Sequence, residues 1–285
     1  MIFNYKINED MNLIDYLNSF HLSKTKIHNL FIDKSIKVNN NECNRNTKLY
    51  KDDIVSILED EEIDFICDNK KLDILYEDDY LLVINKPSNI IVHPDDKSKN
   101  GSLCNIVANY YKNKGYNISI KYAHRLDIDT TGIIIFCKDM LTMAYMNHII
   151  STHEVKRYYK AFVSGKFDDK YGIIDFPIGE DRHHKSRRRV SKTGQKAITH
   201  YEVLKDYGGY SLVELLLETG RTHQIRVHMS YIGHPLLGDQ LYGGSIKKIK
   251  RVALHSAKVS FIHPVTKEEI KLIKEMPFDM KNLVR

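Results

Sequence analysis

The chain has few cysteines, and those present are far apart in the sequence. Cys43, Cys67, Cys104 and Cys137 form no close pair. This spacing argues against a disulfide scaffold and against a cysteine-bound zinc site, and it fits a reducing compartment. No apolar run reaches the length of a membrane span, and the N-terminal residues lack the apolar core of a signal peptide. We therefore predict a cytoplasmic location.

Motifs that hold cofactors or metals are also missing. The sequence contains no glycine-rich phosphate loop and no dinucleotide fingerprint. His183, His184 and His200 lack the spacing of metal ligands, and His223 and His228 are five residues apart, which spans about 140° around a helix axis. We therefore predict neither a cofactor nor a metal.

Length and charge set the remaining bounds. The 285 residues allow one domain of about 200 residues and a small additional module. Hydrophobic residues make up 42% and charged residues 28%, which is ordinary for a soluble globular protein. The formal net charge of +6 is compatible with a polyanionic partner.

About the first 60 residues predict a small α/β module. Ser23 can cap a helix with Ile27 and Leu30 on one face, and residues 35–40 and 54–58 have the pattern of short strands. Over residues 1–62 this arrangement resembles an S4 RNA-binding domain. The resemblance implies phosphate contacts by Lys24, Lys26, Lys34 and Lys37. The alternative is a common α/β module whose lysines are merely exposed.

Acidic residues 59–62, with Asp64 close behind, predict the end of this module. We interpret them, with residues 63–72, as a linker that would repel RNA. The catalytic domain is predicted to follow over residues 73–285.

A crowded polar stretch precedes an apolar run in the middle of the chain. Residues 124–132 have the sequence HRLDIDTTG, and residues 133–136, IIIF, predict a buried strand. The polar stretch therefore lies on a loop that enters a sheet, where such crowding is typical of a reaction centre. The alternative is a solvated turn in which Asp129 and Thr130 bond their own backbone.

Three more stretches accompany this loop in a characteristic order. Asn85-Lys86-Pro87 ends one predicted strand, residues 157–165 (RYYKAFVSG) predict another, and residues 219–229 (TGRTHQIRVHM) predict a strand-to-helix turn with Thr222 as the cap. Together the motifs resemble the RluA-type pseudouridine synthases, whose signature is HRLD-x-x-T-S-G. Thr131 replaces the usual serine and keeps its hydroxyl. The resemblance covers about residues 75–275.

The resemblance implies a fold and three site residues. The fold is α+β, with a mixed, mainly antiparallel sheet, flanking helices and a central catalytic cleft. Asp127 is then the nucleophile, Arg221 its ion-pair partner, and Tyr159 the active-site tyrosine, because the spacing to Gly165 favours it over Tyr158. Tyr159 would stack on the uracil and relay the C5 proton, provided that the site lowers its pKa. Without the motif, both tyrosines would be ordinary edge residues.

Basic residues are concentrated between two predicted strands. Residues 182–196 include seven lysines or arginines, and no apolar periodicity predicts a helix or strand there. We predict a mobile arm that holds RNA phosphates through Arg187, Arg188 and Arg189, and a solvated loop is the alternative. Arg125 is a candidate to fill the space left by an everted uridine or to hold a phosphate, with a structural role as the alternative.

The implied function is isomerisation of specific uridines in RNA to pseudouridine. An S4 module ahead of the catalytic domain is similar to the members that modify the large ribosomal subunit, so we expect 23S ribosomal RNA as the substrate. Alternatives are a transfer RNA synthase of the same family, a non-catalytic RNA-binding ribosome-assembly factor, and a metal-dependent hydrolase with His124 or His223 as base. We predict RNA as the partner, no membrane association, and a monomer.

Overall fold

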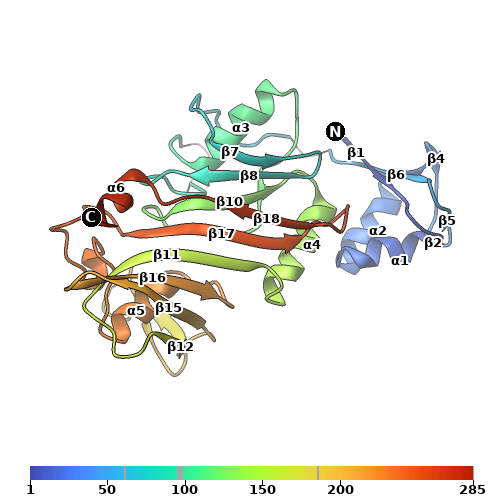
Figure 1. Cartoon of the computed structure of the whole chain (residues 1–285). Helices are drawn as coiled ribbons and strands as arrows, with labels where there is room; N and C mark the ends of the chain where they lie inside the picture. The colour runs from blue at the N-terminus through green and yellow to red at the C-terminus, as the bar shows by residue number, and fades with distance from the viewer. Residues whose placement is uncertain (61, 95–98, 185, 285) are drawn as a thin grey trace.

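One large sheet forms the centre of the molecule (Figure 1), which is described here from a computed structural model. The structure describes residues 1–60, 62–94, 99–184 and 186–284. Glu61 of the acidic stretch and Lys185 of the basic run lie outside the described residues. The strand order is β12-β15-β16-β11-β17-β10-β8-β7, with β9 beside β10 and β18 beside β17.

The strands of this sheet are β7 (Ile74–Glu77), β8 (Leu81–Lys86), β9 (Lys121–Tyr122), β10 (Thr131–Cys137), β11 (Lys156–Ser164), β12 (Tyr171–Asp175), β15 (Ile198–Asp206), β16 (Tyr210–Leu217), β17 (Leu254–Ile262) and β18 (Glu269–Ile273). Among the strands that the structure describes in this sheet, only the β10–β17 pair is parallel, and the other pairs are antiparallel. The expected α+β fold with a mainly antiparallel sheet is therefore confirmed.

Helices and short elements flank the sheet. They are α3 (Leu103–Asn113), α4 (Met140–Ser151), the hairpin β13 (Ile178–Glu180) and β14 (Arg188–Val190), α5 (Gln224–Tyr231), η1 (Gln240–Tyr242), α6 (Phe278–Lys281) and η2 (Asn282–Val284). Helix α3 begins after Ser102, which forms a capping box with Asn105. In Figure 1, α3 lies near β7 and α5 near β15 and β16. Within the described ranges, no helix combines the length and the apolarity needed to cross a bilayer.

The N-terminal residues form a separate small sheet with two helices at one end of the molecule (Figure 1). Its elements are β1 (Ile2–Lys6), β2 (Met11–Asn12), α1 (Leu13–Ser19), α2 (Lys24–Ile32), β3 (Ile36–Val38), β4 (Asn41–Glu42), β5 (Lys48–Leu49) and β6 (Ile54–Leu58). The four-stranded sheet has the order β1-β6-β3-β4. Ser23 caps α2 as predicted, its hydroxyl accepting from the Lys26 amide at 3.2 Å.

The start of the acidic stretch is a buried junction and not a solvated linker. Glu59 is 1% exposed, accepts from Lys121 Nζ at 2.9 Å, and accepts from the Met140 amide at 2.5 Å. Nearby, the Tyr5 hydroxyl donates to Asp139 at 2.6 Å in a buried contact. The linker interpretation was therefore wrong for Glu59, because its charge is paired with groups from the large sheet and α4.

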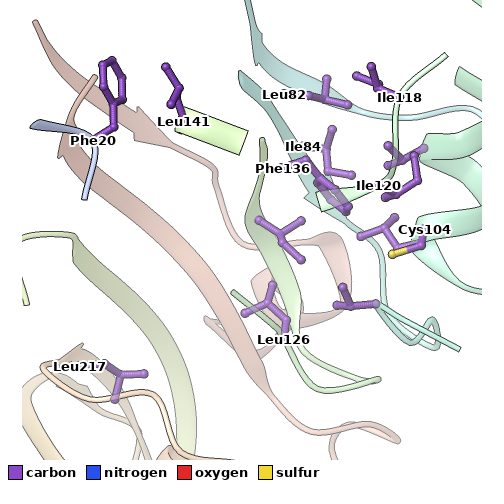
Figure 2. Close-up of a cluster of buried hydrophobic side chains, with 14 of the residues drawn as sticks. Phe20, Leu82, Ile84, Cys104, Ile118, Ile120, Leu126, Phe136, Leu141 and Leu217 are labelled. Carbon is purple, nitrogen blue, oxygen red and sulfur yellow. The ribbon is translucent and has the colours of Figure 1, made fainter. Parts of the chain in front are cut away.

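The apolar run of β10 is continuous because both of its faces are buried. Ile134 and Phe136 belong to one core cluster, and Ile133 and Ile135 belong to another on the opposite face. Figure 2 shows Phe136 beside Ile84, with Cys104 of α3 close by. A strand packed on both sides is a rigid support for the loop that precedes it.

Candidate active site

The loop between β9 and β10 carries Asp127 and is fixed by a buried lysine. The Asp127 carbonyl accepts from the Thr130 amide at 3.1 Å, which closes a turn. Lys86 Nζ donates to the carbonyls of Ile128 at 2.8 Å and Thr130 at 2.9 Å, and to that of Pro87 at 3.0 Å. Three acceptors match the three donors of an ammonium group. Lys86 therefore holds the loop.

A second cation, Arg251, holds the Asp129 carbonyl, which lies between the carbonyls of Ile128 and Thr130. Arg251 Nη1 donates to the carbonyl of Asp129 at 3.1 Å. The same guanidinium is anchored by Asp279 of α6, through Nε at 2.7 Å and Nη2 at 2.9 Å. The carbonyls of residues 128–130 are thus each bonded to a buried or half-buried cation, so the loop backbone is held from two sides.

Burial opposes the charge on Lys86. Its side chain is fully buried, and desolvation lowers the pKa of its ammonium to about 7, against the opposing effect of the Asp127 and Asp129 charges. Lys86 therefore titrates near neutral pH in the folded protein.

Asp127 pairs with Arg226, and the predicted pair with Arg221 is wrong. Arg226 Nη1 donates to Asp127 Oδ2 at 3.2 Å. Arg226 is itself held by a two-pronged contact with Asp239, at 2.7 Å from Nε and 2.9 Å from Nη2. Arg221 is exposed, and its Nε donates to the Lys196 carbonyl at 3.0 Å.

The local structure at the start of α5 explains this correction. Helix α5 begins at Gln224, after His223 in the left-handed region at φ 58°, and Thr222 is not the cap. The Gln224 side chain accepts from the Arg221 amide at 3.0 Å and from Thr219 Oγ1 at 2.7 Å. This turn directs the Arg221 side chain toward Lys196, whereas Arg226, in the first turn of the helix, faces the loop of Asp127.

Arg226 could have been suspected from its sequence neighbours. It lies among Ile225, Val227 and Met229, which are all buried, and an arginine inside such a run needs an acidic partner. Burial opposes its charge, but the bonds and charges of Asp239 and Asp127 outweigh burial and raise the pKa of the guanidinium above its ordinary value. Arg226 therefore stays charged.

Tyr159 faces the same site, and its pKa is shifted in the opposite direction from the one a base needs. It lines the pocket and is 4% exposed, whereas Tyr158 lies on the other face beneath Lys258. The strand therefore presents Tyr159, and not Tyr158, to the pocket. Burial raises the pKa of the Tyr159 phenol, with Asp127 adding a smaller effect in the same direction. The lowered pKa required for a phenolate base is absent.

Asp127, Tyr159 and Arg226 line one pocket of about 890 Å³. It brings together Arg125, Asp127, Tyr159, Arg188 and Arg221, which the sequence singled out separately. It also includes buried Arg157, Gln224 and Arg226, whose participation was missed. A space of this size, lined by several cations and by the carboxylates of Asp127 and Glu218, suits a nucleotide with its phosphates.

The basic run contains a strand that the charge pattern concealed. Arg188–Val190 form β14 and pair with β13. Arg188 also pairs with Glu180 at 3.2 Å, and Arg187 lies 5.4 Å from the Tyr242 ring. The prediction that this run has no strand was wrong, because three residues suffice for a hairpin arm. Only Arg188 of the three arginines lines the pocket.

The four predicted lysines of the N-terminal unit are exposed and lie apart from the pocket lining: Lys24, Lys26, Lys34 and Lys37. Lys34 forms an ion pair with Glu42 at 3.0 Å. Across the described residues, no group of three or more His, Cys, Asp or Glu side chains is arranged to hold a metal ion.

Comparisons with known proteins agree on one family. A family model described as RNA pseudouridylate synthase matches residues 80–231. The Bacillus subtilis protein named as an uncharacterized RNA pseudouridine synthase, YhcT, is 44% identical over 92% of this chain and 88% of its own length. Ribosomal large subunit pseudouridine synthase D of Haemophilus influenzae is 35% identical over 79% of this chain and 74% of its own.

Solved structures give the same result for the fold. The structure of human RNA Pseudouridylate Synthase Domain Containing 4 is 26% identical, with a TM-score of 0.61 over 73% of this chain and 90% of that chain. Human RNA Pseudouridylate Synthase Domain Containing 1 is 23% identical, with a TM-score of 0.60 over 73% of this chain and 84% of that chain.

Proposed function

The chain belongs to the RNA pseudouridylate synthases, isomerases that convert uridine to pseudouridine in RNA, and from this premise we propose that Asp127 is its nucleophile. One observation carries the proposal. The Asp127 carboxylate lies in the main pocket, on a loop fixed by buried cations, 3.2 Å from a guanidinium. A charge-assisted bond of this kind orients a carboxylate and pairs its charge.

The reaction explains why one positioned carboxylate is enough. The N1–C1′ bond of the uridine breaks, the base turns, and C5 joins C1′. C5 loses its proton and N1 gains one, so no redox partner or group donor is consumed. In our proposal Asp127 acts either by attack at C1′ or through elimination to a glycal. Both routes require an ionised acid held close to the sugar.

Tyr159 is proposed as the second reacting residue. Its ring can stack on the uracil, and its hydroxyl can relay a proton only as the neutral phenol, because burial raises its pKa. Arg221 is proposed to contact the RNA at the mouth of the pocket, since it lines the pocket and its side chain is exposed.

The everted nucleotide needs cationic surroundings. We propose that Arg125, exposed and adjacent to the nucleophile loop, fills the vacated stack or holds a phosphate. The hairpin β13–β14 with Arg187, Arg188 and Arg189 is proposed to hold phosphates beside the pocket. Lys24, Lys26, Lys34 and Lys37 are proposed to extend this contact if the N-terminal unit acts as an S4-like RNA-binding domain.

We propose 23S ribosomal RNA as the substrate. The support is the similarity to proteins named ribosomal large subunit pseudouridine synthase D, which are 33% to 35% identical. Transfer RNA is the second candidate. The monomeric state and the cytoplasmic location stay predictions from the sequence.

Replacing the nucleophile tests the proposal directly. The Asp127→Asn variant keeps the shape and removes the charge, so tritium release from RNA labelled at C5 of uridine should fall at least about 10³-fold. Total RNA from a strain lacking this protein supplies the substrate, and mapping its pseudouridines against wild-type RNA names the position. Release at the wild-type rate by Asp127→Asn would contradict the assignment. A missing pseudouridine in transfer RNA alone would overturn the ribosomal substrate.

A further inference from the structure

The Tyr242 hydroxyl lies between the basic hairpin and the nucleophile. Tyr242 ends η1 and is 4% exposed. Its hydroxyl oxygen accepts from the backbone N–H of Arg188 in β14 at 2.8 Å. The same hydroxyl is 2.9 Å from Nδ1 of His223, the residue just before α5. A single phenol therefore connects β14 to the start of α5.

The hydrogen bonds of the Tyr242 hydroxyl indicate which tautomer the His223 ring adopts. The Arg188 N–H can only donate, so it occupies a lone pair of the Tyr242 oxygen. In the part of the chain that the structure describes, the one acceptor for the Tyr242 hydrogen is His223 Nδ1. We assign the Tyr242 hydrogen to this contact, which leaves Nδ1 unprotonated and places the ring hydrogen on Nε2. Burial lowers the pKa of His223, which agrees with a neutral ring.

The Nε2 atom of that ring points to the nucleophile. It lies 3.9 Å from Asp127 Oδ2, the oxygen that Arg226 also contacts. This distance is too long for a hydrogen bond but short enough that a small movement would form one. His223 is held at φ 58° in the left-handed region, a conformation that most residues avoid and that often occurs at functional sites.

We propose that Tyr242 and His223 are positioning residues for the nucleophile, the Tyr242 hydroxyl holding the His223 ring so that its Nε2–H faces the Asp127 carboxylate. This inference rests on the proposed role of Asp127. A neutral N–H donor orients the Asp127 carboxylate, which pairs with the charge of Arg226, and does not transfer a proton to it. The same hydroxyl also bonds to the Arg188 N–H of β14, so Tyr242 positions both the β13–β14 hairpin and, through His223, the Asp127 carboxylate.

The Tyr242→Phe variant removes the hydroxyl and keeps the ring, which lies 5.0 Å from the Arg226 guanidinium. Single-turnover tritium release is measured on C5-labelled total RNA from a strain lacking the protein, at increasing enzyme concentration. We expect the limiting rate to fall roughly tenfold, the effect of one lost oriented hydrogen bond, with the half-saturating concentration unchanged. The matched control is Tyr210→Phe, which removes a hydroxyl bonded at 2.9 Å to the Leu283 carbonyl, outside the pocket lining, and should keep the wild-type rate.

A double-mutant cycle separates positioning from a general loss of structure. His223→Asn removes Nε2 while asparagine tolerates the left-handed backbone. If the hydroxyl acts through His223, the double variant is no slower than His223→Asn alone, whereas independent structural damage makes the two losses multiply. Thermal unfolding confirms that each variant is folded. A Tyr242→Phe rate equal to wild type, or multiplying losses, overturns the inference. A wild-type protein that releases no more tritium than Asp127→Asn overturns the proposed function itself.

Discussion

Arg226 binds two carboxylates at once, and this double contact determines which substitution it tolerates. Its guanidinium holds Asp239 with two nitrogens and Asp127 with a third. A lysine ammonium is a single point charge and cannot span both acids. We therefore expect Arg226→Lys to lower turnover about 10- to 100-fold although the charge is preserved.

The comparison variant is Arg221→Lys, at the position that the family motif suggested as the partner of Asp127. Pairing through Arg221 would make that change the more damaging one. The geometry of the site requires the reverse order, because Arg221 donates to the Lys196 carbonyl and not to Asp127. Steady-state tritium release from RNA, measured on both variants, decides between the two partners.

Lys86 should make stability depend on pH in a defined window. Burial lowers its folded pKa to about 7, and an unfolded lysine titrates near 10.4. Between these values the unfolded chain binds more protons than the folded one, so the free energy of unfolding rises with pH. From pH 7 to 9 we expect wild type to gain about 2 kcal/mol relative to Lys86→Met.

Urea unfolding at several pH values measures this difference. Lys86→Met also leaves the loop carbonyls without their donor, which lowers stability at every pH. The difference in slope between the two proteins is therefore the informative quantity, and parallel curves would show that Lys86 stays charged throughout.

Strand β10 approaches β17 so closely that its second residue must be glycine. Gly132 has φ 110°, and a Cβ there would lie 2.2 Å from the Ser256 carbonyl oxygen and 2.8 Å from its carbonyl carbon. Backbone atoms cannot move aside as a flexible side chain can. We expect Gly132→Ala to destabilise the protein by about 3 kcal/mol or more and to displace the adjoining nucleophile loop.

Gly233→Ala is the matched control for backbone strain. Gly233 has φ 90°, and a Cβ there would meet nothing within 4 Å. Its cost should be that of the left-handed conformation alone, about 1–2 kcal/mol. Equal urea midpoints for the two variants would contradict a steric role for Gly132.

Local hydrophobic patterns predict a strand where the residues of that strand alone determine its burial. The run of residues 133–136 is apolar at every position, and it forms a strand buried on both faces. For β11 the family motif, aligned by its spacing to Gly165, indicated Tyr159 rather than Tyr158, and Tyr159 lines the pocket. The short strand Arg188–Val190 was missed because two of its residues are charged and only its pairing with β13 defines it.

Long-range partners could not be predicted in this way. Asp127 and Arg226 are 99 positions apart, and local spacing says nothing of which arginine reaches the carboxylate. Glu59 has the same sequence surroundings as a solvated acid, yet its partners come from β9 and α4. Which charged side chains are buried depends on how elements far apart in the sequence pack together. A single sequence indicates such packing only where it resembles a known family.

The joint between the N-terminal unit and the large sheet gives the last prediction. Glu59 is buried and accepts hydrogen bonds from both Lys121 and the Met140 amide at the start of α4. Glu59→Ala removes the carboxylate from a buried pair, so we expect a loss of about 3 kcal/mol or more in urea unfolding. Glu62, in the same acidic stretch but exposed, is the control, and Glu62→Ala should change stability by no more than about 0.5 kcal/mol. A linker that only carries charge would give two equally small effects, whereas a joint that ties α4 to the N-terminal unit gives a large effect at Glu59 alone.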